Sequence, residues 1–276
     1  MSGVNHGFTL WKKKGVRYLT IPSFERAGNV TCVMSTRIGG VSPKPYDTLN
    51  FSRSREQNEE NYRQNFSNYG TAAGFEYQKA VANRYEHGNN VLIVGAEEAG
   101  MGVVKPELPV FCDGLITTQE WLPLVTYHAD CVPLFFYDPK RRAAAICHAG
   151  WKGVSMHIIT KTVDALCGFG CRRDDILTAV GPCISAKHYE VQSDVYEVFN
   201  QDFGPHVLQK RDGKVYLDLP QACLADFKSS GIPDANITFS DLCTYDNPRL
   251  FYSHRRDRGE TGAMAAVIML GRQKQA

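Results

Sequence analysis

The chain has 276 residues, of which 43% are hydrophobic and 22% are charged, and its formal net charge is +2. This composition suffices for a large core, while the near-neutral charge, without a basic stripe, argues against a nucleic-acid partner. No apolar run reaches the roughly 18–20 residues of a membrane-spanning helix, and the N-terminal sequence MSGVNHGFTLWKKKG lacks the apolar core of a signal peptide, so we expect a cytoplasmic protein without a membrane partner.

Strands are predicted where β-branched and aromatic residues cluster. These segments are 29–35, 91–95, 122–127, 132–137, 143–147, 176–180, 237–240, 250–253 and 263–270.

Helices are predicted between these strands. One follows the capping-box pattern Ser54-Arg55-Glu56-Gln57 and carries Tyr62, Phe66 and Tyr69 on one face. The others span about 153–167, 193–203 and the segment between Asp218 and Gly231. Because strands and helices do not alternate strictly, we predict an α+β fold of mixed β-sheets with flanking helices. No linker divides the sequence, so residues 1–276 are expected to form a single compact domain.

The nine cysteines are an odd number in a chain without a secretory signal, which predicts reduced thiols. No CxxC pair occurs, so a structural zinc knuckle is not expected.

The segment from Thr126 to Gly153 carries the most information about function. Two apolar strands, 132–137 and 143–147, are predicted to form a hairpin through the sequence DPKR. A symmetric hairpin centred between Pro139 and Lys140, with a four-residue loop, would place Cys131 directly opposite His148. Their Cβ atoms would then lie about 4.5–5.5 Å apart. A thiolate and an imidazole so placed suit one metal ion.

A third ligand would complete a catalytic metal site. His87 lies in the sequence YEHGNN, a turn just before the predicted strand at Val91. Together, His87, Cys131 and His148 form a Cys/His₂ set, and three protein ligands leave one position open for water or substrate.

Several polar residues at strand ends are candidates for substrate contacts. Asp130 precedes Cys131 and could move protons. Gly150 and Gly153 flank Trp151 at a predicted helix start, which favours an anion, and Trp151 could stack on a planar base. Arg37, in the sequence STRIGGVS, suits bidentate binding of a phosphate or carboxylate.

The motifs together resemble the YfiH-like family, also called laccase-domain or polyphenol oxidoreductase-like proteins. The resemblance covers nearly the whole chain and includes STRIGGVSPKPYDTLNFS, EHGNNV, DGLITT, HADCVP, HAGWKG, GPCIS, CTY and FYSHRRDRGETGAMAA. It implies an α+β fold, a metal site of His87, Cys131 and His148, and an anion-binding role for Arg37. It also implies purine nucleoside phosphorylase and adenosine deaminase activity.

Three positions depart from the pattern that the resemblance implies. Tyr85 stands where the family usually has Gln, His128 replaces a small polar residue, and Ala263 replaces Arg in the usual TGRM. Tyr85 and His128 could therefore change the substrate preference. His128 has the opposite strand parity from Cys131, so we do not expect it to be a ligand.

Four hypotheses follow. The leading one is a zinc-dependent purine nucleoside phosphorylase with adenosine deaminase activity, whose partners are small-molecule nucleosides and phosphate. In the second, Cys131 is a nucleophile activated by His148, in a cysteine hydrolase or amidase acting on a cell-wall precursor, as in peptidoglycan editing. The third is a non-catalytic, metal-stabilised binding protein, and the fourth a polyphenol oxidase with copper in place of zinc. The sequence leaves the oligomeric state open.

Overall fold

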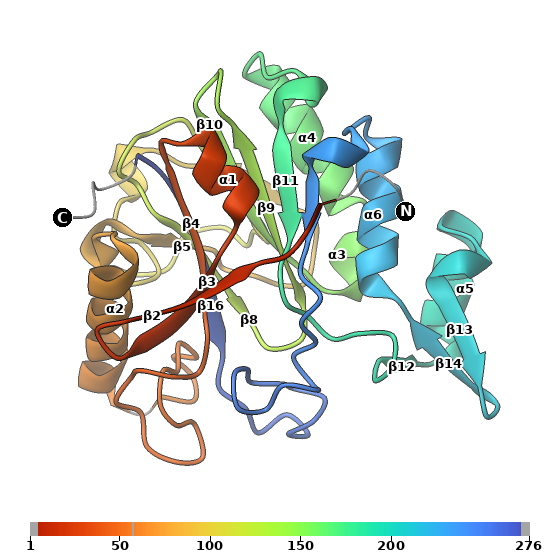
Figure 1. Cartoon of the computed structure of the whole chain (residues 1–276), viewed down its shortest axis with the longest axis horizontal. Helices are drawn as coiled ribbons and strands as arrows, with labels where there is room; N and C mark the ends of the chain where they lie inside the picture. Colours follow the sequence, from red (N-terminus) through yellow and green to blue (C-terminus); the bar gives the residue numbers. More distant parts are fainter. Residues whose placement is uncertain (1–4, 57, 272–276) are drawn as a thin grey trace.

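The computed structural model describes residues 5–56 and 58–271, and Figure 1 shows how the elements are arranged. The strands are β1 (Asn5–His6), β2 (Thr9–Lys13), β3 (Val16–Thr20), β4 (Val30–Ser35), β5 (Val81–Ala82), β6 (Val91–Ile93), β7 (Gly114–Thr117), β8 (Leu124–His128), β9 (Val132–Asp138), β10 (Ala143–Ala149), β11 (Leu177–Val180), β12 (Glu190–Val191), β13 (Leu208–Arg211), β14 (Lys214–Leu217), β15 (Ile237–Phe239) and β16 (Met264–Leu270). The α-helices are α1 (Pro22–Ala27), α2 (Glu59–Ala73), α3 (Trp151–Ser155), α4 (Ile158–Gly168), α5 (Ser193–Asp202) and α6 (Leu219–Ser229).

Most strands belong to two mixed sheets. The larger has the order β1-β15-β11-β9-β10-β7-β6 and the smaller the order β2-β3-β4-β16-β8-β5. In the larger sheet, parallel pairs such as β11 with β15 occur beside antiparallel pairs such as β9 with β10. A separate three-stranded antiparallel sheet has the order β12-β14-β13. The predicted α+β fold with mixed sheets and flanking helices is confirmed.

The two large sheets pack face to face, and helices cover their outer faces. Residues of β9 alternate between the two sides: Phe135 and Tyr137 lie in the core between the sheets, whereas Phe136 packs on Phe227 of α6. The outer face of the smaller sheet packs on α2. Figure 1 shows α2 on one side of the sheets and α3, α4 and α6 on the other. Because β9 is buried on both faces, its sequence is continuously apolar rather than alternating.

All predicted strands except one correspond to observed strands, with ends that differ by at most a few residues. The exception is 250–253, which forms no strand. Residues 251–253 are buried, but their amides find partners other than a neighbouring strand: the Phe251 amide donates to the Asn247 carbonyl and the Tyr252 amide to Met264 Sδ. Burial alone produced the apolar pattern there, so the strand prediction for 250–253 is wrong.

Two of the predicted helices need correction. The first begins at Glu59, and its N-cap is Asn58, whose side chain accepts a hydrogen bond from the Glu60 amide, so the cap proposed at Ser54 is wrong. The apolar face of this helix is buried as predicted. The predicted helix over 153–167 is divided into α3 and α4, because His157 adopts a left-handed conformation with φ 56° between them.

The hairpin of β9 and β10 has a different register from the predicted one. Ala143 pairs with Asp138, and His148 pairs with Pro133. Cys131 precedes β9 and does not lie directly opposite His148, so that prediction is wrong. The loop does contain four residues, but it lies one residue later in the chain than predicted.

Asp138 explains the shift of the loop. Its carboxylate accepts hydrogen bonds from the amides of Lys140 and Arg141, at 2.8 and 3.0 Å, and so forms the turn after Asp138 rather than before it. The pairing moves by two residues, an even number, which keeps each side chain on its original face of the sheet. Cys131 and His148 therefore still meet, as diagonal rather than direct neighbours.

Candidate functional site

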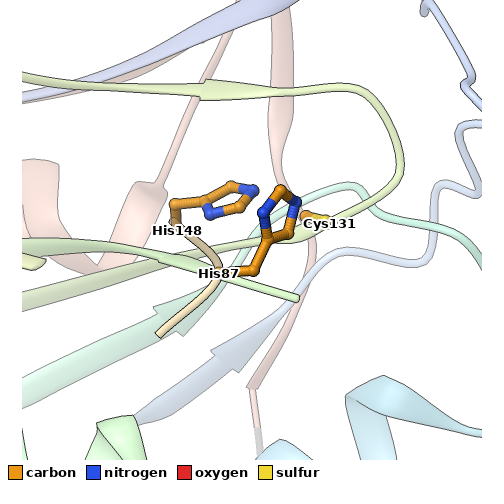
Figure 2. A group of neighbouring side chains, drawn as sticks. All are labelled: His87, Cys131 and His148. Atoms are coloured by element: carbon orange, nitrogen blue, oxygen red, sulfur yellow. The ribbon is translucent and has the colours of Figure 1, made fainter. Parts of the chain in front are cut away.

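Three potential metal ligands converge at the C-terminal end of β10, an interior strand of the larger sheet. His87 lies in the loop between β5 and β6, Cys131 in the loop between β8 and β9, and His148 near the end of β10. Their ligand atoms all lie within 4.8 Å of one another, and Figure 2 shows the three side chains pointing toward a common centre. Within residues 5–56 and 58–271, this is the one such group of three or more His, Cys, Asp or Glu side chains.

The electrostatics of this cluster favour a thiolate. Burial by itself would raise the pKa of the Cys131 thiol, but the charge and hydrogen bonds of His148 and His87 lower the pKa to about 6. Burial opposes the charged form of His148, whereas Cys131 and Asp113 raise its pKa to about 9. Thiolate sulfur and imidazole nitrogen are both ligand types that zinc binds, and three protein ligands leave one position open, as in catalytic zinc sites. The residues therefore fit a zinc ion.

Asp113 holds the ring of His148 and the backbone of the turn that carries His87, although it precedes β7 and belongs to neither ligand segment. Its carboxylate accepts a 2.9 Å hydrogen bond from Nδ1 of His148, which leaves Nε2 of that ring for a metal. It also accepts bonds from the amides of Glu86, His87 and Gly88, at 3.1, 3.1 and 2.7 Å. Although burial opposes ionisation, these donors lower the pKa of Asp113.

No role for Asp113 is predicted from the sequence. Its only signal was the DGLITT motif, and nothing in that motif shows that Asp113 folds back onto the turn at His87.

Gly150 gives the ligands room to meet. A Cβ atom on this residue would lie 3.1 Å from Cδ2 of His87 and 3.3 Å from Sγ of Cys131. Gly153 has a similar role, because a Cβ there would lie 2.7 Å from the carbonyl oxygen of Gly88. Both glycines therefore let the start of α3 lie close to the loop that carries His87.

The cluster opens into a cavity of about 440 Å³. Aromatic side chains form much of its wall, among them Tyr85, Trp151 and Tyr189. The ring of Tyr85 lies 4.7 Å from that of His148 and 5.4 Å from that of His87, measured between centroids, and the residue is 43% exposed. Burial, then the charges of Cys131 and Asp113, raise the pKa of Tyr85. All three positions that depart from the family pattern, Tyr85, His128 and Ala263, line this cavity.

His128 lies beside the cluster but outside the ligand set. Its Nε2 is 2.8 Å from the Thr126 hydroxyl and its Nδ1 is 3.2 Å from the Cys131 carbonyl oxygen, so both ring nitrogens have protein partners. Burial, together with the charge of His148, lowers the pKa of His128 well below the usual value. The expectation that it is not a ligand agrees with this geometry.

The other residues predicted to contact substrate differ in their position relative to the cavity. Trp151 and Asp130 line the cavity, whereas Arg37 does not. The Asp130 carboxylate accepts hydrogen bonds from the hydroxyls of Thr244 and Ser253, at 2.6 and 3.0 Å, and from the Arg255 amide at 2.7 Å. These three donors fix its orientation.

Arg37 instead joins two loops. Its Nε donates to the Asp47 carbonyl and its Nη1 to the Pro248 carbonyl, at 2.9 and 3.2 Å, while the guanidinium lies over the Tyr252 ring. These contacts hold Arg37 in a structural role between two loops. The anion-binding role predicted for it therefore has no support from its position.

The chain resembles known proteins over most of its length. The profile of the family described as "Multi-copper polyphenol oxidoreductase laccase" matches residues 31–271. The chain is 35% identical to a "Purine nucleoside phosphorylase" of Deinococcus radiodurans, over 87% of this chain and 89% of that protein. It is 32% identical to "Purine nucleoside phosphorylase YlmD" of Bacillus subtilis, over 85% of this chain and 86% of that protein.

A solved structure has the same fold. The crystal structure of the hypothetical protein YfiH from Bacillus licheniformis superimposes with a TM-score of 0.88 at 29% identity, covering 95% of this chain and 98% of that one. In the described part of this chain, no helix is both long and apolar enough to cross a membrane.

Proposed function

The chain belongs to the multi-copper polyphenol oxidoreductase laccase family, and from this premise we propose that it is a zinc-dependent purine nucleoside phosphorylase with adenosine deaminase activity. The relatives named purine nucleoside phosphorylase support the reaction class. The observation that carries the proposal is the Cys/His₂ cluster of His87, Cys131 and His148 at an aromatic-lined cavity of about 440 Å³. A cavity of this kind suits a small planar ligand with a few polar groups.

Different residues of the site would bind the purine and hold the metal ligands. Tyr85, Trp151 and Tyr189 offer apolar faces for a purine ring. Asp113 holds the imidazole of His148 in the orientation that presents Nε2 to a metal. Zinc, when bound, lowers the pKa of a coordinated water and polarises oxygen atoms of the substrate.

In phosphorolysis, a phosphate oxygen forms a bond to C1′ of the ribose while the bond from C1′ to the purine nitrogen breaks. The departing base takes a proton, and the products are the free base and ribose 1-phosphate. In deamination, water replaces the amine of adenosine, which leaves as ammonia. Asp130 is the one carboxylate among the described residues that line the cavity, so it stays our candidate for moving protons.

Product analysis tests the proposal. Purified protein is incubated with adenosine or inosine, with and without phosphate, and the products are separated by chromatography, with His148→Ala as the control. We expect free base and ribose 1-phosphate only with phosphate, and inosine from adenosine in either case. If wild type forms no more product than His148→Ala, the proposal fails.

One observation favours a second function. The pKa of Cys131 is lowered to about 6, as in a cysteine nucleophile paired with a histidine base. A hydrolase or amidase acting on a cell-wall precursor would use this pair without a metal. Metal quantification separates the two: near-stoichiometric zinc that is lost in Cys131→Ala supports ligation, whereas active metal-free protein supports the nucleophile. Bound copper together with oxidation of a phenol would instead favour an oxidase.

A further inference from the structure

We propose that Arg55 and Arg255 form the site that binds the phosphate co-substrate, at the wall of the cavity that holds the Cys/His₂ cluster. This inference rests on the proposed phosphorylase function. Both arginines line the cavity, whereas Arg37 does not.

Arg255 presents a free edge of its guanidinium. Its Nη1 donates to the carbonyls of His188 and Glu190, at 3.4 and 2.9 Å, and the group lies 5.0 Å from the ring centre of Tyr189. Among the described residues, neither Nε nor Nη2 of Arg255 has a hydrogen-bond partner. That edge carries two parallel N–H groups, the arrangement that binds a phosphate in a bidentate manner. The protein therefore fixes the side chain while leaving its anion-binding edge open.

Arg55 comes to the same wall from a different loop. Its Nη2 donates to the carbonyl of Gly259 at 3.0 Å, which ties it to the loop that carries Arg255. Its other recorded contact is a long one, 3.9 Å from Nη1 to Glu260, and the side chain is 42% exposed. Ser52 and Ser54, which also line the cavity, add two hydroxyl groups beside it.

Nearby arginines that the structure describes do not combine a place in the cavity wall with unpaired guanidinium N–H groups. Arg256 uses all its nitrogens within the protein: Nε on Asp257, Nη1 on the Thr244 carbonyl and Nη2 on Asp257 and the Phe251 carbonyl. Arg53 pairs with Glu59 at 3.0 Å, lies over the Tyr62 ring, and does not line the cavity.

The charge of the wall also suits an anion. Asp130, the one carboxylate among the described lining residues, already accepts three hydrogen bonds, one of them from the Arg255 amide. Neither arginine has a close carboxylate partner in the described part of the chain. The two guanidinium charges are therefore left to attract a ligand, and a phosphate bound there would share the cavity with the nucleoside.

The test compares Arg55→Gln, Arg255→Gln and Arg255→Lys with the matched controls Arg53→Gln and Arg258→Gln. Arg258 is an exposed residue of the Arg255 loop that does not line the cavity. The KM for phosphate is measured in inosine phosphorolysis, together with the KM for inosine and the rate of phosphate-independent adenosine deamination. Melting temperatures show that each variant is folded.

We expect the KM for phosphate to rise roughly 10-fold or more for Arg55→Gln and Arg255→Gln, since each loses a charge-assisted hydrogen bond. Arg255→Lys keeps the charge but loses the bidentate edge, so an intermediate rise is expected. The KM for inosine and the deamination rate should stay within about twofold of wild type, as should every parameter of the two controls. Equal effects on the KM for phosphate in the cavity variants and in the controls would overturn the proposal.

Failure of the proposed function would be a separate result. If wild type carries out no phosphorolysis, binding of inorganic phosphate is measured directly by calorimetry in wild type and in the double variant Arg55→Gln/Arg255→Gln. Binding that is lost in the double variant supports the anion site even without the phosphorylase. Binding that persists, or is absent from wild type, refutes it.

Discussion

Replacing Asp113 by Asn tests whether this carboxylate holds the metal ligands in place. The substitution keeps the shape of the side chain but turns one oxygen into an NH₂ group. Each Asp113 oxygen faces two N–H donors: Oδ1 faces the His148 ring and the His87 amide, and Oδ2 faces the amides of Glu86 and Gly88. In either orientation of the amide, two donors would face another donor.

The size of the effect follows from these contacts. A buried donor left without an acceptor costs about 1–3 kcal/mol. The bonds from Glu86, His87 and Gly88 are only partly buried, so two lost bonds would cost at most about 2–6 kcal/mol of folding free energy. Loss of the residue that orients a ligand histidine typically weakens metal binding about 10- to 100-fold. We therefore expect Asp113→Asn to lower both the free energy of unfolding and the affinity for zinc.

The assay is a zinc titration against a competing chelator, on protein shown by circular dichroism to be folded. Asp138→Asn is the matched control: Asp138 is also fully buried and also accepts two amide hydrogen bonds, but it lies at the far end of the hairpin. Only Oδ1 of Asp138 accepts these bonds, and its Oδ2 has no hydrogen-bond partner among the described residues, so Asn can keep its oxygen toward both amides. This variant should therefore keep most of its stability and the wild-type affinity for zinc. If Asp113→Asn binds zinc within about twofold of wild type, the role assigned to Asp113 is refuted.

Three further predictions concern the site and the core. Gly150→Ala should weaken zinc binding several-fold with little change in melting temperature, because the new Cβ would lie 3.1 Å from His87 Cδ2; unchanged affinity in the chelator titration would contradict this. Chelation should lower the melting temperature of wild type but not of Cys131→Ala, since a ligand that binds only the native state stabilises it by about 2.7 kcal/mol at 100 times its Kd; equal shifts would count against Cys131 as a ligand. Phe135→Ala should cost about 3–5 kcal/mol in urea denaturation, because Phe135 is fully buried between the sheets, whereas Phe169→Ala, at a residue 38% exposed, should cost less than about 0.5 kcal/mol.

The N-terminal strands show where sequence reasoning failed for the fold. β2 and β3 form an antiparallel pair, but β2 is mostly exposed and rich in lysine, so it lacks the apolar pattern of a buried strand. The turn between them uses positive φ at Lys14 and Gly15. The opposite error occurred at 250–253, where a buried apolar segment satisfies its backbone through turns. An apolar sequence pattern indicates that a segment is buried. A buried segment need not pair with a strand, and a paired strand need not be buried.

The α+β class, most of the buried strands and the three candidate ligands could all be predicted from the amino-acid sequence. These features depend on local pattern and on residue chemistry: apolar runs define buried strands, and Cys and His next to strand ends are suited to bind metal. A shift in register by an even number of residues leaves each side chain on the same face of the sheet. For this reason Cys131 and His148 still lie close together although the predicted pairing was wrong.

The polar residues that surround those ligands could not be predicted from the sequence, because they come from distant segments of the chain. Asp113 reaches His148 across 35 positions of sequence, and Arg55 meets the loop of Arg255 across about 200. Arg37, which a local motif favoured, instead donates hydrogen bonds to the backbone carbonyls of Asp47 in its own loop and of Pro248 in a distant one. Whether an arginine keeps a free edge or an aspartate finds a histidine depends on the packing of distant segments, and no local pattern encodes that packing.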